Sequence, residues 1–172
     1  RFEDINTSSV LAANLAQPTF IGGEYVAGND EESGVTGQAV QIYGGGTPIS
    51  PMIFQDATFQ STNKGCGNRD GGRSAIWASQ TFIRVQNSDF VGGDFGISIR
   101  NSAGKVTNST ITVTCNGIDV NSLKAIGNTE YDVEISNNVI TTTQRTPITA
   151  YSGADVRIHN NELAGAGEGS GI

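Results

Sequence analysis

Several residue types are scarce in this chain of 172 residues, and each scarcity excludes a class of protein. No apolar run reaches the roughly 18 residues that indicate a membrane-spanning helix. Lys and Arg number 10 against 17 Asp and Glu, and the net charge is −7. Because no basic stretch occurs either, we expect neither a nucleic acid nor a membrane as partner. Aromatic residues are few, and the apolar residues are mainly Ile and Val, which suit β-strands.

What the chain has instead is a short phrase that occurs six times. It reads apolar residue, any residue, two small turn-forming residues, any residue, apolar residue. The copies begin at Phe20, Phe54, Val85, Val106, Ile135 and Ile158. Repeats separated by 21 to 34 residues are typical of a solenoid, in which each unit buries its apolar face by stacking on its neighbours.

Each copy is flanked by short segments in which apolar and polar residues alternate. One segment enters the turn pair, as at Met52 and Phe54, and another follows some residues later, as at Ile76 and Ala78. A period of two indicates strands rather than helices. Asn, Asp and Gly at the turn pair tolerate the left-handed backbone region, and stacked Asn side chains should form a ladder. The sequence therefore predicts an all-β parallel β-helix of about six rungs, with three short strands per rung.

Three strands per turn and a tight Asn corner make the chain resemble the pectate-lyase-like superfamily of parallel β-helix proteins. The resemblance covers residues 18–172 and implies a right-handed coil. Residues 1–17 are expected to form a lead-in, in which residues 8–16 form a short helix that caps the column, with Ser8 or Ser9 as its N-cap. Ile172 falls on an inward position of an unfinished rung, which predicts either a longer solenoid or stacking on another chain.

Two cysteines and one acidic loop are further candidates for a structural or ligand role. By the predicted register Cys66 and Cys115 lie two rungs apart, about 9.6 Å in height, whereas a disulfide needs Cα atoms closer than about 7 Å. The segment 60–74 is long enough to climb one rung, so a disulfide and two unpaired thiols both stay open. The run Asp30-Glu31-Glu32 offers oxygens to Ca²⁺ but lacks a spaced ligand loop, so we expect a solvated loop without metal or cofactor.

One outward strip combines aromatic and hydrogen-bonding side chains. It lies on the strand that follows the two longest loops, residues 26–37 and 60–74. Sugar rings need aromatic faces for their CH groups and polar groups for their hydroxyls. The resemblance implies the same place, because superfamily members that act on polysaccharides bind them along this strand. The predicted binding residues are Tyr43, Trp77, Arg100, Asp119 and Tyr151. The alternative is an ordinary polar strand face on which the preceding loop covers Trp77.

The catalytic motifs of enzymes with this fold are incomplete here. Asn116 stands where polygalacturonase-like hydrolases have a catalytic Asp, and Phe95 stands where the second acid of their paired-aspartate motif belongs. Asp94 and Asp119, on adjacent rungs, could approach the carboxyl separation of about 6.5–9.5 Å that inversion requires. Arg100 is a cation of the type that a lyase or epimerase needs. These three residues are the catalytic candidates, whereas His159, the only histidine, is expected to be a solvated turn residue.

Taken together, the patterns predict an extracellular β-helix segment, secreted or at the cell surface, with a carbohydrate-binding or structural, adhesive role. Its expected partner is a polysaccharide or cell-surface glycan. Two alternatives stay open. The first is a polysaccharide lyase, glycoside hydrolase or uronate epimerase whose active site uses residues outside this segment. The second is a filament subunit that stacks end to end through open β-helix ends.

Overall fold

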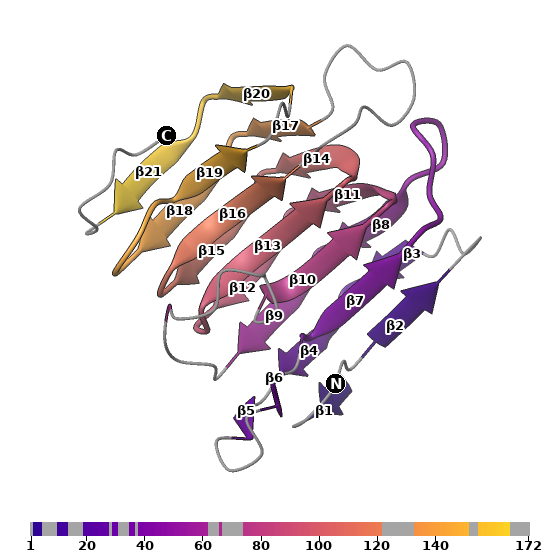
Figure 1. Cartoon of the computed structure of the whole chain (residues 1–172), viewed down its shortest axis with the longest axis horizontal. Helices are drawn as coiled ribbons and strands as arrows, with labels where there is room; N and C mark the ends of the chain where they lie inside the picture. The colour runs from indigo at the N-terminus through magenta and orange to yellow at the C-terminus, as the bar shows by residue number, and fades with distance from the viewer. Residues whose placement is uncertain are drawn as a thin grey trace.

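Three parallel sheets wind around a single core in the computed structural model (Figure 1). The structure describes residues 2–4, 10–13, 19–27, 29–30, 35–36, 38–61, 66, 74–121, 133–151 and 155–165. Successive strands enter the three sheets in turn, so each circuit of the chain adds one strand to each sheet. Six full circuits make a right-handed parallel β-helix of six rungs, which confirms the predicted fold class.

The strands of each sheet lie in chain order along the column. Sheet B contains β2 (Val10–Ala13), β7 (Val40–Tyr43), β10 (Ser74–Ser79), β13 (Phe95–Arg100), β16 (Asn116–Asn121) and β19 (Ile148–Tyr151). Sheet C contains β3 (Thr19–Ile21), β8 (Met52–Gln55), β11 (Phe82–Gln86), β14 (Ala103–Thr107), β17 (Val133–Ser136) and β20 (Val156–His159). Sheet A contains β1 (Phe2–Asp4), β4 (Glu24–Ala27), β9 (Thr58–Ser61), β12 (Asp89–Val91), β15 (Thr110–Val113), β18 (Val139–Thr142) and β21 (Glu162–Gly165). A short antiparallel pair, β5 (Asn29–Asp30) and β6 (Val35–Thr36), lies outside these sheets.

The repeated turn pair forms the corner between sheets C and A. Its first residue adopts the left-handed conformation in every rung, with φ between 50° and 67°. These residues are Gly22, Asp56, Asn87, Asn108, Asn137 and Asn160. Gly, Asn and Asp tolerate this conformation best, which explains why the two-residue phrase recurs.

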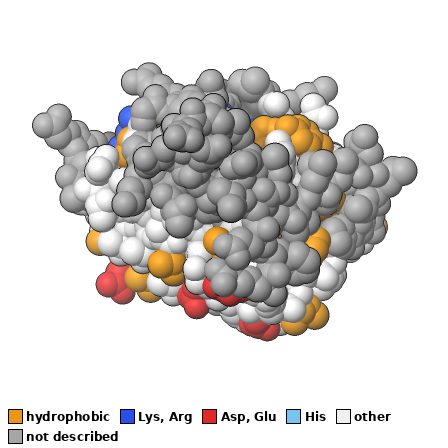
Figure 2. All heavy atoms as spheres, turned by 90° about the horizontal axis from the view of Figure 1, so that it is seen from below, with side chains coloured by type: hydrophobic (Ala, Val, Ile, Leu, Met, Phe, Trp, Pro, Cys, Tyr) orange, Lys and Arg blue, Asp and Glu red, His pale blue; other side chains and the backbone are white. Residues whose placement is uncertain are grey.

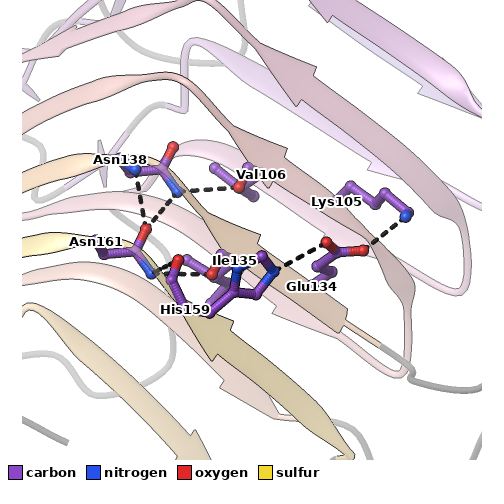
Figure 3. Close-up of polar contacts among 7 residues, drawn as sticks. All are labelled: Lys105, Val106, Glu134, Ile135, Asn138, His159 and Asn161. Carbon is purple, nitrogen blue, oxygen red and sulfur yellow. Dashed lines mark hydrogen bonds and ion pairs between the residues drawn. The ribbon is translucent and has the colours of Figure 1, made fainter.

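The second residue of the pair points into the column and builds a polar ladder. Ser88 Oγ accepts a hydrogen bond from the Ala57 amide at 3.3 Å, and Ser109 Oγ accepts one from the Ser88 amide at 3.2 Å. Asn138 and Asn161 extend the ladder, because Asn138 Oδ1 accepts from the Ser109 amide and Asn161 Oδ1 accepts from the Asn138 amide, each at 3.0 Å. Figure 3 shows the second of these bonds. The predicted Asn ladder is thus confirmed, and its members are the inward residues rather than the left-handed ones.

Apolar side chains from all three sheets stack in files inside the column. Phe59 packs face to face with Phe90 at 4.6 Å between ring centroids, and Phe20 packs on Phe54 at 4.9 Å. Further along the column the files consist of fully buried Ile and Val. Like residues stack because the parallel register places equivalent positions of successive rungs in contact.

The prediction of a helix near the N-terminus is wrong for the residues of that stretch that the structure describes. Val10–Ala13 forms strand β2, which pairs with β7, and Phe2–Asp4 forms β1, which pairs with β4. The sheets therefore begin before residue 18. Leu and Ala favour helices, but a helix this short is marginal by itself, and pairing with the edge of an existing sheet outweighs that propensity. The rest of the expected helix and the unfinished rung at Ile172 lie outside the described residues.

A disulfide joins Cys66 to Cys115, with 5.7 Å between their Cα atoms. Cys66 follows β9 in the second rung and Cys115 follows β15 in the fourth, so the disulfide links residues that follow sheet A strands two rungs apart. The carbonyl oxygen of Cys66 also accepts a hydrogen bond from the Arg145 guanidinium. Of the two possibilities that the sequence left open, the structure has the disulfide.

The described part of the chain lacks two features, a membrane-spanning helix and a cluster of metal-ligating side chains. No helix there is long and apolar enough to span a bilayer. No group of three or more His, Cys, Asp or Glu side chains is arranged there to hold a metal ion. Within the acidic run considered for Ca²⁺, Glu31 and Glu32 lie outside the described residues.

Candidate functional site

The outward face of sheet B carries two parallel rows of side chains, in the register that the sequence predicts. One row consists of Gln41, Trp77, Ser98, Asp119 and Thr149. The other consists of Tyr43, Ser79, Arg100, Asn121 and Tyr151. Neighbours within a row lie about 4.8 Å apart, so Tyr43 and Tyr151 are separated by about 19 Å along the column. All five predicted binding residues therefore lie on one face, which we call the sheet B strip.

An aromatic pair occupies the N-terminal part of the strip. The rings of Tyr43 and Trp77 are 4.7 Å apart between centroids and inclined at 59°. Gln41 donates a hydrogen bond from Nε2 to the Tyr43 hydroxyl oxygen at 2.7 Å, which fixes that ring. Tyr43 is 42% exposed and Trp77 is partly exposed. The pair thus presents apolar ring surface to solvent beside an amide group.

A polar network occupies the C-terminal part of the strip. Arg100 Nη2 lies 2.8 Å from Asp119 Oδ2, and Arg100 Nε donates to Ser98 Oγ at 3.1 Å. Thr149 donates its hydroxyl proton to Asp119 Oδ1 at 2.7 Å and accepts a hydrogen bond from Asn116 Nδ2 at 2.9 Å. Each Asp119 oxygen therefore already has a partner, and its charge is balanced by Arg100. Such a network holds its members in one arrangement.

The strip is only partly exposed, which corrects the expectation of a single exposed face. Ser98 is fully buried and Asp119 is 4% exposed, although both point away from the core. The aromatic pair and Tyr151, which is 50% exposed, are the accessible parts. Strand alternation reveals which side of the sheet a residue faces, but it does not reveal what lies over that side.

Two amide oxygens beside the network have no hydrogen-bond donor among the described residues. They are Asn116 Oδ1 and Asn121 Oδ1, and both are buried. Buried acceptors are nearly always satisfied, by protein, water or ligand. The sequence singled out Asn116 only as a missing catalytic acid, and its bond to Thr149 could not be predicted because it crosses rungs.

Asp94 lies apart from the other two catalytic candidates. It is completely buried at the corner before β13, and its carbonyl oxygen accepts the Cys115 amide at 2.8 Å. The register places Asp119 opposite Ser98, four residues further along the strand direction, or about 13 Å. The structure therefore joins Arg100 and Asp119 in an ion pair, whereas Asp94 lies at the other end of the strand, four residues before the level of Asp119.

Comparisons with protein families, with curated proteins and with solved structures each found no match to this chain. The parallel β-helix and the side chains of the sheet B strip are therefore the basis on which a function can be argued.

Proposed function

We propose that the chain is an extracellular β-helix segment of the pectate-lyase-like type that binds a saccharide along the sheet B strip. The observation that carries the proposal is the solvent-facing Tyr43–Trp77 pair with Gln41 beside it. Aromatic faces bind the CH groups of a sugar ring, and an adjacent amide binds its hydroxyls.

The rest of the strip supports a ligand longer than one sugar ring. Tyr151 offers a second exposed ring about 19 Å from Tyr43. Between the two rings lie Arg100, with a side chain 20% exposed, and Asn121, whose buried amide oxygen has no donor among the residues that the structure describes. Rigid strands hold these groups in place, so little conformational entropy is lost when a ligand binds.

The disulfide supports the extracellular part of the proposal. Disulfides persist in oxidising compartments such as the cell exterior and are rare in the cytosol. Cys66 and Cys115 are the only cysteines in the chain, and they are bonded to each other.

The polar network favours binding over catalysis. A general acid or base must be free to exchange a proton with the substrate. Asp119 instead accepts hydrogen bonds on both oxygens and is paired with Arg100. A lyase or epimerase acting on uronates also needs a free cation, and Arg100 is engaged. Assays for unsaturated or epimerised uronate after incubation with pectin and alginate test this alternative, and turnover would contradict a purely binding role.

The binding proposal is tested by titrating the intrinsic fluorescence of Trp77 with a panel of neutral and acidic oligosaccharides. We expect a saturable change with at least one of them, and at least a tenfold loss of affinity in Trp77→Ala. Ile49→Ala is the matched control, because Ile49 is an exposed apolar residue outside the strip. If no member of the panel changes the fluorescence, or if Trp77→Ala binds as the wild type does, the proposal is wrong.

A further inference from the structure

Cationic side chains gather on the outer face of sheet C. Arg84, Lys105, Glu134 and Arg157 occupy equivalent outward positions of four successive rungs. They come from positions up to 73 residues apart, so the sequence contains no basic stretch that would predict this cluster. Glu134 is the only acidic residue on the strands of this sheet, and we call the four residues the sheet C row.

Sheet A has the opposite charge. Its outward positions include Glu24, Asp89 and Glu162, and none of its strands contains Lys or Arg. In Figure 2 the acidic side chains lie along the lower margin of the view, whereas the visible Lys and Arg side chains lie at the upper margin. A chain with a net charge of −7 therefore presents one locally positive face, since charges beyond about 8 Å are screened at physiological salt.

Glu134 organises the cations around it. Its carboxylate lies 2.6 Å from Lys105 Nζ and 3.2 Å from His159 Nε2 (Figure 3). His159 is thus partly buried against Glu134 and is not simply the solvated turn residue that the sequence predicted. The hydrogen bonds from Lys105 and His159 lower the pKa of the Glu134 carboxyl, so it stays ionised and holds both partners in place.

We propose that the outer face of sheet C binds an acidic polysaccharide, whose negative groups lie along the sheet C row. Arg84, Lys105 and Arg157 supply the charge, and they extend over about 14 Å along the column. This site is separate from the sheet B strip and does not depend on the function proposed for it.

Neighbouring side chains favour a saccharide over other polyanions. Gln86 and Thr107 lie in the adjacent outward row, where amide and hydroxyl groups face the same side as the cations. Such groups bind sugar hydroxyls. A polysaccharide carries more hydroxyl groups than an array of lipid headgroups or a nucleic acid backbone does. The overall negative charge also opposes a polyanion as dense in charge as nucleic acid.

The test measures binding of polygalacturonate at low salt by calorimetry. The double variant Arg84→Gln/Lys105→Gln removes two positive charges near the ligand and should weaken binding about tenfold. Glu134→Gln removes one negative charge there and should strengthen binding about threefold. Gln60→Glu/Thr112→Asp is the control. It changes the net charge by the same two units but on the outward face of sheet A, and it should alter binding less than twofold.

Three results would overturn the proposal. The first is equal weakening by the sheet C and sheet A double variants, which would mean that only net charge matters. The second is wild-type binding by the sheet C double variant. The third is binding of anionic lipid vesicles or a single-stranded oligonucleotide as tight as that of polygalacturonate. Trp77→Ala, measured alongside, should leave polygalacturonate binding at sheet C unchanged.

Discussion

Replacing Asn138 tests whether the internal ladder stabilises the stack of rungs. Asn138 is buried, and its side chain links three successive rungs (Figure 3). Oδ1 accepts from the Ser109 amide at 3.0 Å, while Nδ2 donates to the Val106 carbonyl oxygen and to Asn161 Oδ1, each at 2.9 Å. Asn138→Ala leaves the Ser109 amide and the Val106 carbonyl without these partners. At about 1–3 kcal/mol for each buried group, the expected loss of unfolding free energy is about 2–6 kcal/mol.

Asn138→Ser is the matched variant, because Ser occupies the same ladder position in two other rungs. Ser109 Oγ accepts from the preceding amide at 3.2 Å and donates to the Thr107 carbonyl at 3.0 Å. A serine at position 138 can do the same, which keeps the Ser109 amide paired and loses only the bond to the Val106 carbonyl oxygen. The expected loss is then about half that of the alanine variant. Urea unfolding followed by circular dichroism measures both. If the two variants lose the same free energy, or if neither loses as much as about 0.5 kcal/mol, the ladder does not stabilise the column as argued.

Three further predictions concern stability. Breaking the Cys66–Cys115 disulfide, which closes a 49-residue separation, should lower the unfolding free energy by about 4 kcal/mol; a reductant that leaves the melting temperature unchanged would contradict the bond. Asn108→Val places a β-branched residue at φ 52° and should cost about 1–2 kcal/mol in urea unfolding, whereas Asn108→Gly should cost less. Because its bonds to Lys105 and His159 lower the pKa of Glu134 in the folded state, its stabilisation is present above about pH 4.3 and lost as the pH falls through the folded pKa. Melting temperatures of wild type and Glu134→Gln should therefore differ at pH 7 and converge only once the pH has fallen below the lowered, folded-state pKa of Glu134.

Much of the architecture could be predicted because it is periodic. The turn pairs identify one corner in each of six rungs, and the alternation around Ile97 and Ile118 sets which residues face the core. From that register the two rows of the sheet B strip follow directly. The disulfide could not be decided in this way, because counting rungs placed Cys66 and Cys115 too far apart and only the length of the segment 60–74 kept the bond possible.

The other features of the fold and of the candidate site depend on contacts that the repeat pattern of the sequence does not predict. The strand at Val10–Ala13 forms because β7 offers an unpaired edge, and the sequence of those four residues does not predict a strand. A second left-handed corner, between sheets B and C, is occupied by Gln80 and Asn101 and lacks a common sequence phrase. Asp119 is buried although strand alternation places it on the outward side, and its bonds to Arg100 and Thr149 reach the neighbouring rungs. The positive face of sheet C was missed because its cations are far apart in the chain.

The proposed saccharide site depends most directly on contact between the ligand and the aromatic end of the sheet B strip. The chain has one tryptophan, so a two-dimensional proton–nitrogen spectrum contains a single indole resonance, from Trp77. Titration with an oligosaccharide identified by the fluorescence panel should shift that resonance saturably, together with the backbone amides of β7 and β10. A ligand that binds while the indole resonance and those amides stay in place would contradict the account.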